Sequence, residues 1–190
     1  MRYQNDIKMK EKILFSEQQK FRQIWLWVMV LSATGASIGV FLWALIQQVV
    51  RGVPFHDKFM SNTELIIAFA FSLGLALVLI ILLVKMRLET IITSEGVKIK
   101  FFPVHHSYRN FQWEDISEAV VKKYSPMKYG GWGIRFKIYH FTVFHNVTAY
   151  NVSGNQALQL HFKNGKKTLI GTQKPYELEV ALRKIEQLNK

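Results

Sequence analysis

Cysteine is absent from this 190-residue chain, so disulfide bonds and thiolate metal sites are excluded. The HExxH motif of zinc metalloproteases is missing as well. One histidine pair, His105 and His106, stands out, but neighbouring residues of an extended chain point in opposite directions. We therefore predict no catalytic residues, no metal ligands and no cofactor.

Charge is absent from two long stretches, 23–50 and 65–84. Each provides the roughly 20 apolar residues that cross a bilayer. The sequence predicts a transmembrane helix in each, joined by a short extracytoplasmic loop at 51–64. Aromatic rings suited to a membrane interface accompany the first stretch: Trp25, Trp27 and Trp43. A buried helix of a soluble protein and, for the first stretch, a cleaved signal peptide are the alternatives, and both favour shorter apolar runs.

Acidic residues are few: 13 Asp and Glu stand against 25 Lys and Arg, a formal charge of +12. The basic residues gather before the first stretch and after the second, whereas the loop between them carries only Arg51 and Lys58. Because cytoplasmic flanks of membrane spans are rich in Lys and Arg, both termini are expected in the cytoplasm. The basic segment 1–22 would then be a cytosolic extension.

Small residues recur within the two stretches at the spacing of helix contacts in lipid. The expected packing positions are Gly35, Gly39, Ala70 and Gly74. We expect them to hold the two spans together as a hairpin, with a homodimer through Gly35 and Gly39 as the alternative. Neither stretch contains an ionisable side chain, which argues against an ion or proton path.

Residues 86–190 have the pattern of one mainly β or α+β domain of six or seven strands. Val97 to Phe101 alternate apolar and charged residues after a turn at 94–96. Asn164-Gly165 predicts a type I′ hairpin turn. After Pro175 the period changes to that of an amphipathic helix. Its predicted apolar face consists of Leu178, Ala181, Leu182, Ile185 and Leu188.

Several short blocks carry a resemblance to a known group. They are Trp113-Glu-Asp-Ile116, Tyr129-Gly-Gly-Trp-Gly-Ile-Arg135, Ala149-Tyr-Asn-Val-Ser-Gly-Asn155, Gly165-Lys and Ile170-Gly-Thr-Gln173. The chain resembles uncharacterised bacterial membrane proteins in which two spans precede a domain similar to bacterial pleckstrin-homology domains. The resemblance implies a strongly bent, seven-stranded antiparallel sheet or barrel closed by the C-terminal helix. It also implies a bacterial inner-membrane location, and it supplies no established activity.

The glycine-rich stretch from Lys128 to Lys137 invites comparison with a phosphate-binding loop. It does not fit, because Phe136 stands where GxGxxG needs its last glycine, and no GK[ST] follows. Alternating Ile134, Phe136 and Ile138 predict a strand rather than a helix after it. The expected structural turn consists of Gly130, Gly131, Trp132 and Gly133.

Basic residues of the C-terminal region form the remaining candidate surface. They are Lys122, Lys123, Lys128, Arg135 and Lys137. Each Lys or Arg near an anionic bilayer contributes about 1 kcal/mol to attraction, so this surface is predicted to contact lipid headgroups or a protein partner. A purely topological excess of positive charge explains the same residues equally well. Nucleic acid is not an expected partner, because no binding motif accompanies the basic residues.

These observations favour a non-enzymatic membrane protein that presents a cytosolic interaction domain to an unknown protein partner or to anionic lipid. The alternative is a small integral-membrane enzyme whose site uses no recognised motif. A pocket in which polar groups converge would favour the enzyme, and a closed, dry barrel with a flat basic face would favour binding.

Overall fold

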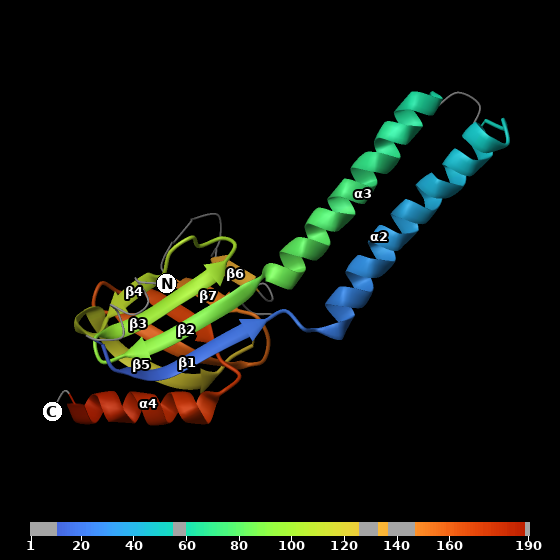
Figure 1. The fold of residues 1–190 in the computed structure, drawn as a ribbon. Coiled ribbons are helices and arrows are strands. Elements are labelled where there is room, and N and C mark those ends of the chain that lie inside the picture. Colours follow the sequence, from blue (N-terminus) through green and yellow to red (C-terminus); the bar gives the residue numbers. More distant parts are fainter. Residues whose placement is uncertain (1–10, 55–59, 126–132, 137–146, 189–190) are drawn as a thin grey trace. The chain divides into compact units, whose positions relative to one another are not determined.

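The computed structural model describes residues 11–54, 60–125, 133–136 and 147–188 (Figure 1). Of residues 133–136 and 147 it describes the backbone only. The chain divides into two compact units. One is helical and consists of Arg22–Val84, and the other, called the β domain below, combines Met1–Phe21 with Lys85–Lys190.

The helical unit contains the two expected apolar helices. Helix α2 spans Ile24–Leu45 and continues as a π-helical turn, Ile46–Val50, and helix α3 spans Asn62–Lys85. Both are long and apolar enough to cross a membrane. Helix α3 starts before the expected residue 65 because Ser61 and Glu64 form a capping box. The Ser61 N–H donates to Glu64 Oε2 at 2.7 Å, and the Glu64 N–H donates to Ser61 Oγ at 3.3 Å.

The expected packing of the two helices through small residues is wrong in the single chain. A Cβ added at Gly35, Gly39 or Gly74 would meet no atom within 4 Å, and Ala70 is exposed. The helices are instead linked by Ser37 Oγ and Ser72 Oγ, 3.0 Å apart. Small-residue spacing shows where backbones can approach closely, but the rotation of each helix decides which face meets its neighbour.

The β domain includes a strand from the N-terminal segment. Strand β1 (Ile13–Lys20) pairs antiparallel with β2 (Arg87–Thr93), from Ile13↔Thr93 to Lys20↔Arg87. The helical unit is therefore inserted between two neighbouring strands. The expected division into a separate segment 1–22 and a domain 86–190 misses this strand. Its inward-facing side chains include the polar residues Glu17 and Gln19. The sequence therefore lacks the apolar alternation typical of a half-buried strand.

Two sheets make up the β domain. The first has the order β1-β2-β3-β4, with β3 at Gly96–Phe102 and β4 at Arg109–Gln112. The expected hairpin turn near 94–96 joins β2 and β3. A 3-10 turn, η2 (Trp113–Asp115), leads to the second sheet.

The second sheet has the order β5-β8-β9-β7-β6. Its strands are β5 (Ile116–Lys123), β6 (Gly133–Phe136), β7 (Val147–Asn151), β8 (Gln156–Phe162) and β9 (Lys167–Gly171). Strands β7 and β9 run parallel, whereas every other pair is antiparallel. The expectation of an all-antiparallel sheet is therefore wrong at this pair. The described residues after position 86 contain eight strands, more than the six or seven expected.

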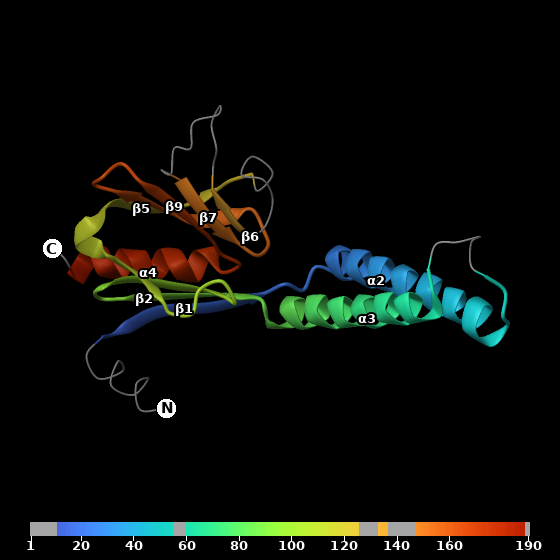
Figure 2. The ribbon, with the colours of Figure 1, turned by 90° about the horizontal axis from the view of Figure 1, so that it is seen from above.

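The C-terminal helix α4 (Pro175–Leu188) lies between the two sheets along one side of the domain (Figure 2). Leu178, Ala181, Leu182 and Ile185 are buried, as the helical spacing predicts, while Leu188 is exposed. Burial of one such stripe against two sheets gives the helix most of its stability, because a helix this short is marginal by itself. The mainly β domain with a terminal helix is thus confirmed.

The β8–β9 turn differs from the expected type I′ geometry. The Gly165 N–H donates to the Phe162 carbonyl at 2.9 Å, and the Phe162 N–H donates to the Lys166 carbonyl at 2.9 Å. These bonds enclose a three-residue loop in which Gly165 has a φ of 79°. A loop of this length places its glycine in the left-handed region after a type I turn, so the same Asn-Gly pair serves a longer loop.

Gly171, at the end of β9, lies directly against the Asn151 side chain at the end of β7. A Cβ on Gly171 would lie 2.2 Å from Asn151 Oδ1. Asn151 is 2% exposed, and neither side-chain polar atom has a hydrogen-bond partner among the described residues. We expect Gly171→Ala to cost about 2 kcal/mol of stability, and Gly171→Ala/Asn151→Ala to recover most of that loss. Urea unfolding of the purified chain measures both, and strictly additive effects would contradict this contact.

Candidate interaction groove

Trp113 is held at the corner between the two sheets. Its backbone N–H donates to the Glu95 carbonyl at 3.2 Å, and its indole Nε1–H donates to the Thr93 carbonyl at 3.0 Å. Both acceptors flank the β2–β3 turn, so the indole ring is fixed to the first sheet. Half-buried indole rings with a satisfied N–H are typical anchors of interaction surfaces.

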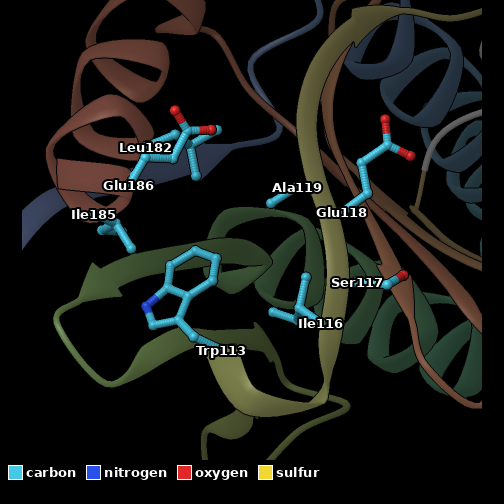
Figure 3. A pocket seen from close by; sticks show the side chains of 8 residues that line it. All are labelled: Trp113, Ile116, Ser117, Glu118, Ala119, Leu182, Ile185 and Glu186. Carbon is cyan, nitrogen blue, oxygen red and sulfur yellow. The ribbon is translucent and has the colours of Figure 1, made fainter. Parts of the chain in front are cut away.

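A groove of about 430 Å³ opens beside this ring, between α4 and the start of β5 (Figure 3). Its lining is made of Trp113, Ile116, Ser117, Glu118, Ala119, Leu182, Ile185 and Glu186. In Figure 3, Leu182, Ile185 and Glu186 project from α4, whereas Trp113 and Ile116 come from the opposite side. The groove is thus a hollow of mixed polarity with Glu186 on its α4 side, while the side chains of Ser117 and Glu118 lie on the far side of β5 in Figure 3.

A second hollow of about 510 Å³ shares Trp113 with the groove. It is lined by Ser94, Glu95, Gln112, Trp113 and Glu114. Together the two linings contain four glutamates and no lysine or arginine. This is unusual in a chain with nearly twice as many basic as acidic residues. The described residues that line the two hollows are therefore acidic rather than basic, a composition suited to a cationic ligand.

Strand β5 forms one edge of the second sheet. It pairs with β8 only, and no other strand of the described residues pairs with its second side. The pairing is irregular between Ile116 and Glu118, next to the groove. An open edge beside a groove can accept an extended segment, whose backbone adds to the sheet while alternate side chains enter the groove.

Ser117, Glu118 and His161 lie close together but do not form a nucleophilic triad. The Ser117 hydroxyl donates to the backbone carbonyl of His161 at 3.0 Å rather than to its ring. The imidazole Nδ1 of His161 lies 3.4 Å from Glu118 Oε2. A nucleophilic serine must donate to the base that removes its proton. This arrangement leaves Ser117 without that base.

His105 has a structural environment. Its Nδ1 accepts a hydrogen bond from the Phe101 N–H at 3.2 Å, and its ring packs edge-on against Tyr150. Burial, and secondarily the charge of Arg109, lower the pKa of His105. A neutral imidazole suits both contacts. The described residues contain no group of three or more His, Asp or Glu side chains that could hold a metal ion.

The predicted basic surface is only partly described. Lys122 and Lys123 lie exposed at the end of β5, whereas Lys128 and Lys137 lie outside the described residues. Arg135 belongs to β6 through its backbone. Since β5 and β6 are opposite edges of the second sheet, three strands separate Arg135 from the lysine pair along that sheet. Of the predicted glycine turn, Gly133 begins β6, and Gly130, Gly131 and Trp132 lie outside the described residues.

A polar cluster on the outer face of β2 is not apparent from the sequence. Glu89 Oε1 accepts from Arg87 Nε at 2.7 Å, and its second oxygen accepts from the Tyr108 hydroxyl. Burial opposes ionisation of Glu89, but these two partners and the Gln18 side chain together outweigh it and lower its pKa. Burial, together with the Glu89 carboxylate, raises the pKa of Tyr108 to about 12. Arg87 of this cluster pairs with Lys20 in the β1–β2 register, at the strand ends that lead to the helices.

Trp113 and Ile116 belong to the Trp113–Ile116 block that the sequence marks, yet only the fold joins them to α4. The groove residues of α4 are the same Leu182 and Ile185 that helical spacing predicts to be buried. Comparison of the chain with protein-family models, with curated proteins and with solved structures gave no match in any of the three.

Proposed function

We propose that this chain is a non-enzymatic membrane-anchored protein whose β domain docks protein partners through the groove between α4 and β5. Helices α2 and α3 anchor it in a bacterial inner membrane, with both termini and the β domain in the cytoplasm. The resemblance to membrane proteins with pleckstrin-homology-like domains is consistent with this role. The proposal excludes a cofactor and nucleic acid as ligands.

The observation that carries the proposal is the open edge of β5 beside a groove of mixed polarity. An extended partner segment would add to β5 through backbone hydrogen bonds. Its apolar side chains would enter the space between Trp113, Ile116 and Ile185. Glu186, on the α4 side of the groove, favours a segment that also carries lysine or arginine.

The second hollow and the residue that follows α3 lie at opposite ends of β2 within the β domain. Strand β2 begins at Arg87, two residues after α3 ends, and runs to the turn at Ser94–Glu95. Its seven residues span about 20 Å at roughly 3.3 Å per residue. The second hollow lies at that far turn. A docked partner would therefore bind about one strand length from the residues that join the helices.

Contact with anionic lipid is the second candidate function. Lys20 and Arg87 are direct neighbours in the β1–β2 register, and Lys85 ends α3. Connections this short hold the three side chains near the headgroup level of any bilayer that α2 and α3 cross. Each would add about 1 kcal/mol of attraction to anionic lipid.

Site-specific photo-crosslinking in host membranes tests the docking role. A photoreactive amino acid at Ser117, beside the groove, should give discrete protein adducts, and Glu186→Lys should reduce them several-fold because it cancels the net negative charge of the lining. The matched control is the same probe at Ser16, an exposed position of β1. A probe at Lys122 reports on the basic surface, where lipid adducts would support the second candidate. Identical adducts at Ser117 and Ser16 would refute the groove as the docking site.

A further inference from the structure

The loop between β3 and β4 has a closed base and an exposed apolar end. The His105 N–H donates to the Phe101 carbonyl at 2.8 Å, and the Phe101 N–H donates to His105 Nδ1 at 3.2 Å. These two bonds enclose three consecutive apolar residues, Phe102-Pro103-Val104, called the apolar tip below. Phe101 and His105 are buried, whereas Val104 is 62% exposed. The loop therefore presents Val104 outward from a buried, hydrogen-bonded base.

The base of this loop contacts both chain segments that lead to the helices. Phe102 pairs with Arg87, two residues after the end of α3, and the Arg87 guanidinium lies 5.6 Å from the centroid of the Phe102 ring. The Phe101 ring meets the Phe21 ring edge-on, with centroids 6.2 Å apart, and Phe21 lies three residues before α2 begins. Two extended residues reach at most about 7 Å, and paired strands lie about 5 Å apart. Chain connectivity alone therefore keeps the apolar tip within about 20 Å of the last residue of α3.

The side chains that accompany the apolar tip are basic. No Asp or Glu occurs from Gly96 to Trp113, the stretch that contains the loop. Glu89 forms an ion pair with Arg87 at 2.7 Å, but the exposed Lys20 and Lys85 take part in no ion pair among the described residues. Lys20 is the direct neighbour of Arg87 in the β1–β2 register, and Lys85 ends α3. An apolar tip accompanied by free lysines matches an anionic bilayer, in which phosphates cover the acyl chains.

We propose that the apolar tip enters the surface of an anionic bilayer, so that Val104 reaches the acyl chains while Lys20 and Lys85 lie at the lipid phosphates. The inference rests on the membrane anchoring of the proposed function and deepens its second candidate, lipid contact, by naming the residues that insert. Each of these contacts is weak by itself. The covalent link to α2 and α3 keeps the tip close to the surface, so its effective concentration there is high and weak contacts suffice.

Single-cysteine labelling tests the contact, because the chain contains no cysteine of its own. Val104→Cys carries a fluorophore, and the full chain is reconstituted in phosphatidylglycerol nanodiscs that hold one chain each. A nitroxide on the lipid acyl chains quenches only a fluorophore that reaches them. The matched control is Ile13→Cys, since Ile13 is also apolar and 46% exposed but pairs with Thr93, at the opposite end of the β1–β2 pair. Quenching of the Val104 label should exceed that of the Ile13 label several-fold.

Lipid charge is the second variable of the experiment. Zwitterionic phosphatidylcholine in place of phosphatidylglycerol should weaken quenching of the Val104 label several-fold, and Lys20→Glu should do the same in phosphatidylglycerol. Both changes remove attraction between the lysines and the phosphates. Lys163→Glu is the matched control, because it changes the net charge equally at an exposed residue whose N–H donates to the Asp115 carbonyl, next to η2. This control variant should leave the quenching unchanged.

The outcomes separate this inference from the proposed function. Equal quenching of the Val104 and Ile13 labels overturns the inference, and so does quenching that is the same in both lipids. Protection of the Val104 label from acrylamide in the water, without quenching by the lipid nitroxide, assigns the cover to protein and overturns it as well. These three results leave partner docking intact, because the adducts at Ser117 report on the groove. A chain that fails to insert into the discs refutes the membrane anchor and, with it, both proposals.

Discussion

Replacing Gly96 with alanine should lower the free energy of unfolding of the β domain by about 3 kcal/mol. Gly96 begins β3 and pairs with Gln112 of β4. An added Cβ would lie 2.2 Å from the Phe111 carbonyl oxygen and 3.0 Å from its carbonyl carbon. Both atoms belong to the backbone, so no side-chain rotation relieves the overlap and β4 itself must move.

The same substitution tests how the groove is supported. Because β4 leads directly into η2, a shift of Phe111 and Gln112 displaces Trp113 from its carbonyl partners. Pulse proteolysis along a urea series, with cleavage products assigned to residues 87–188, measures the stability of the domain. Gly74→Ala is the matched control, because its Cβ would meet open space on α3. A Gly96→Ala domain as stable as that control would contradict the close β3–β4 approach.

Local patterns are sufficient to predict several elements. The two charge-free stretches match α2 and α3 to within a few residues, because a long apolar run has no other stable form than a helix buried in protein or lipid. The alternation of Val97 to Phe101 identifies β3, and helical spacing identifies the buried side of α4. In each case the signal lies within one element.

Features that depend on contacts between distant segments are not visible in those patterns. Strand β1 is separated from its partner β2 by the whole helical unit, and its inward side carries Glu17 and Gln19 in place of apolar residues. The parallel pairing of β7 with β9 also skips the intervening strand β8. The groove requires α4 and β5 to meet, so no local motif marks it.

The Ile170-Gly-Thr-Gln173 block illustrates the difference between a local sequence pattern and the distant contacts that explain it. The sequence marks it as characteristic without giving a reason. In the structure, the Thr172 hydroxyl donates to Glu17 Oε2 at 2.7 Å, and the Gln173 N–H donates to Glu17 Oε1 at 2.8 Å. Gly171 in turn accepts a hydrogen bond from Gln19 Nε2 at its carbonyl. The block therefore hydrogen-bonds to Glu17 and Gln19, the two polar side chains on the inner side of β1.

Glu17→Ala should therefore destabilise the β domain by about 3 kcal/mol, a large effect for a polar residue on an edge strand. Glu17 is 6% exposed, so its removal leaves the buried Thr172 hydroxyl and the Gln173 N–H without their acceptor. Glu17→Gln keeps one acceptor oxygen and should cost about half as much. Ser16→Ala, on the exposed side of the same strand, is the control and should be neutral within about 0.5 kcal/mol.

The proteolysis measurement described for Gly96→Ala also gives the stability of these three variants. The order of their stabilities decides whether β1 belongs to the folded domain. If β1 is integral, Glu17→Ala exposes cleavage sites in β2 and α4 together, since Glu17 joins the strand before α2 to the segment that enters α4. If β1 were a detachable extension, Glu17→Ala and Ser16→Ala would behave alike.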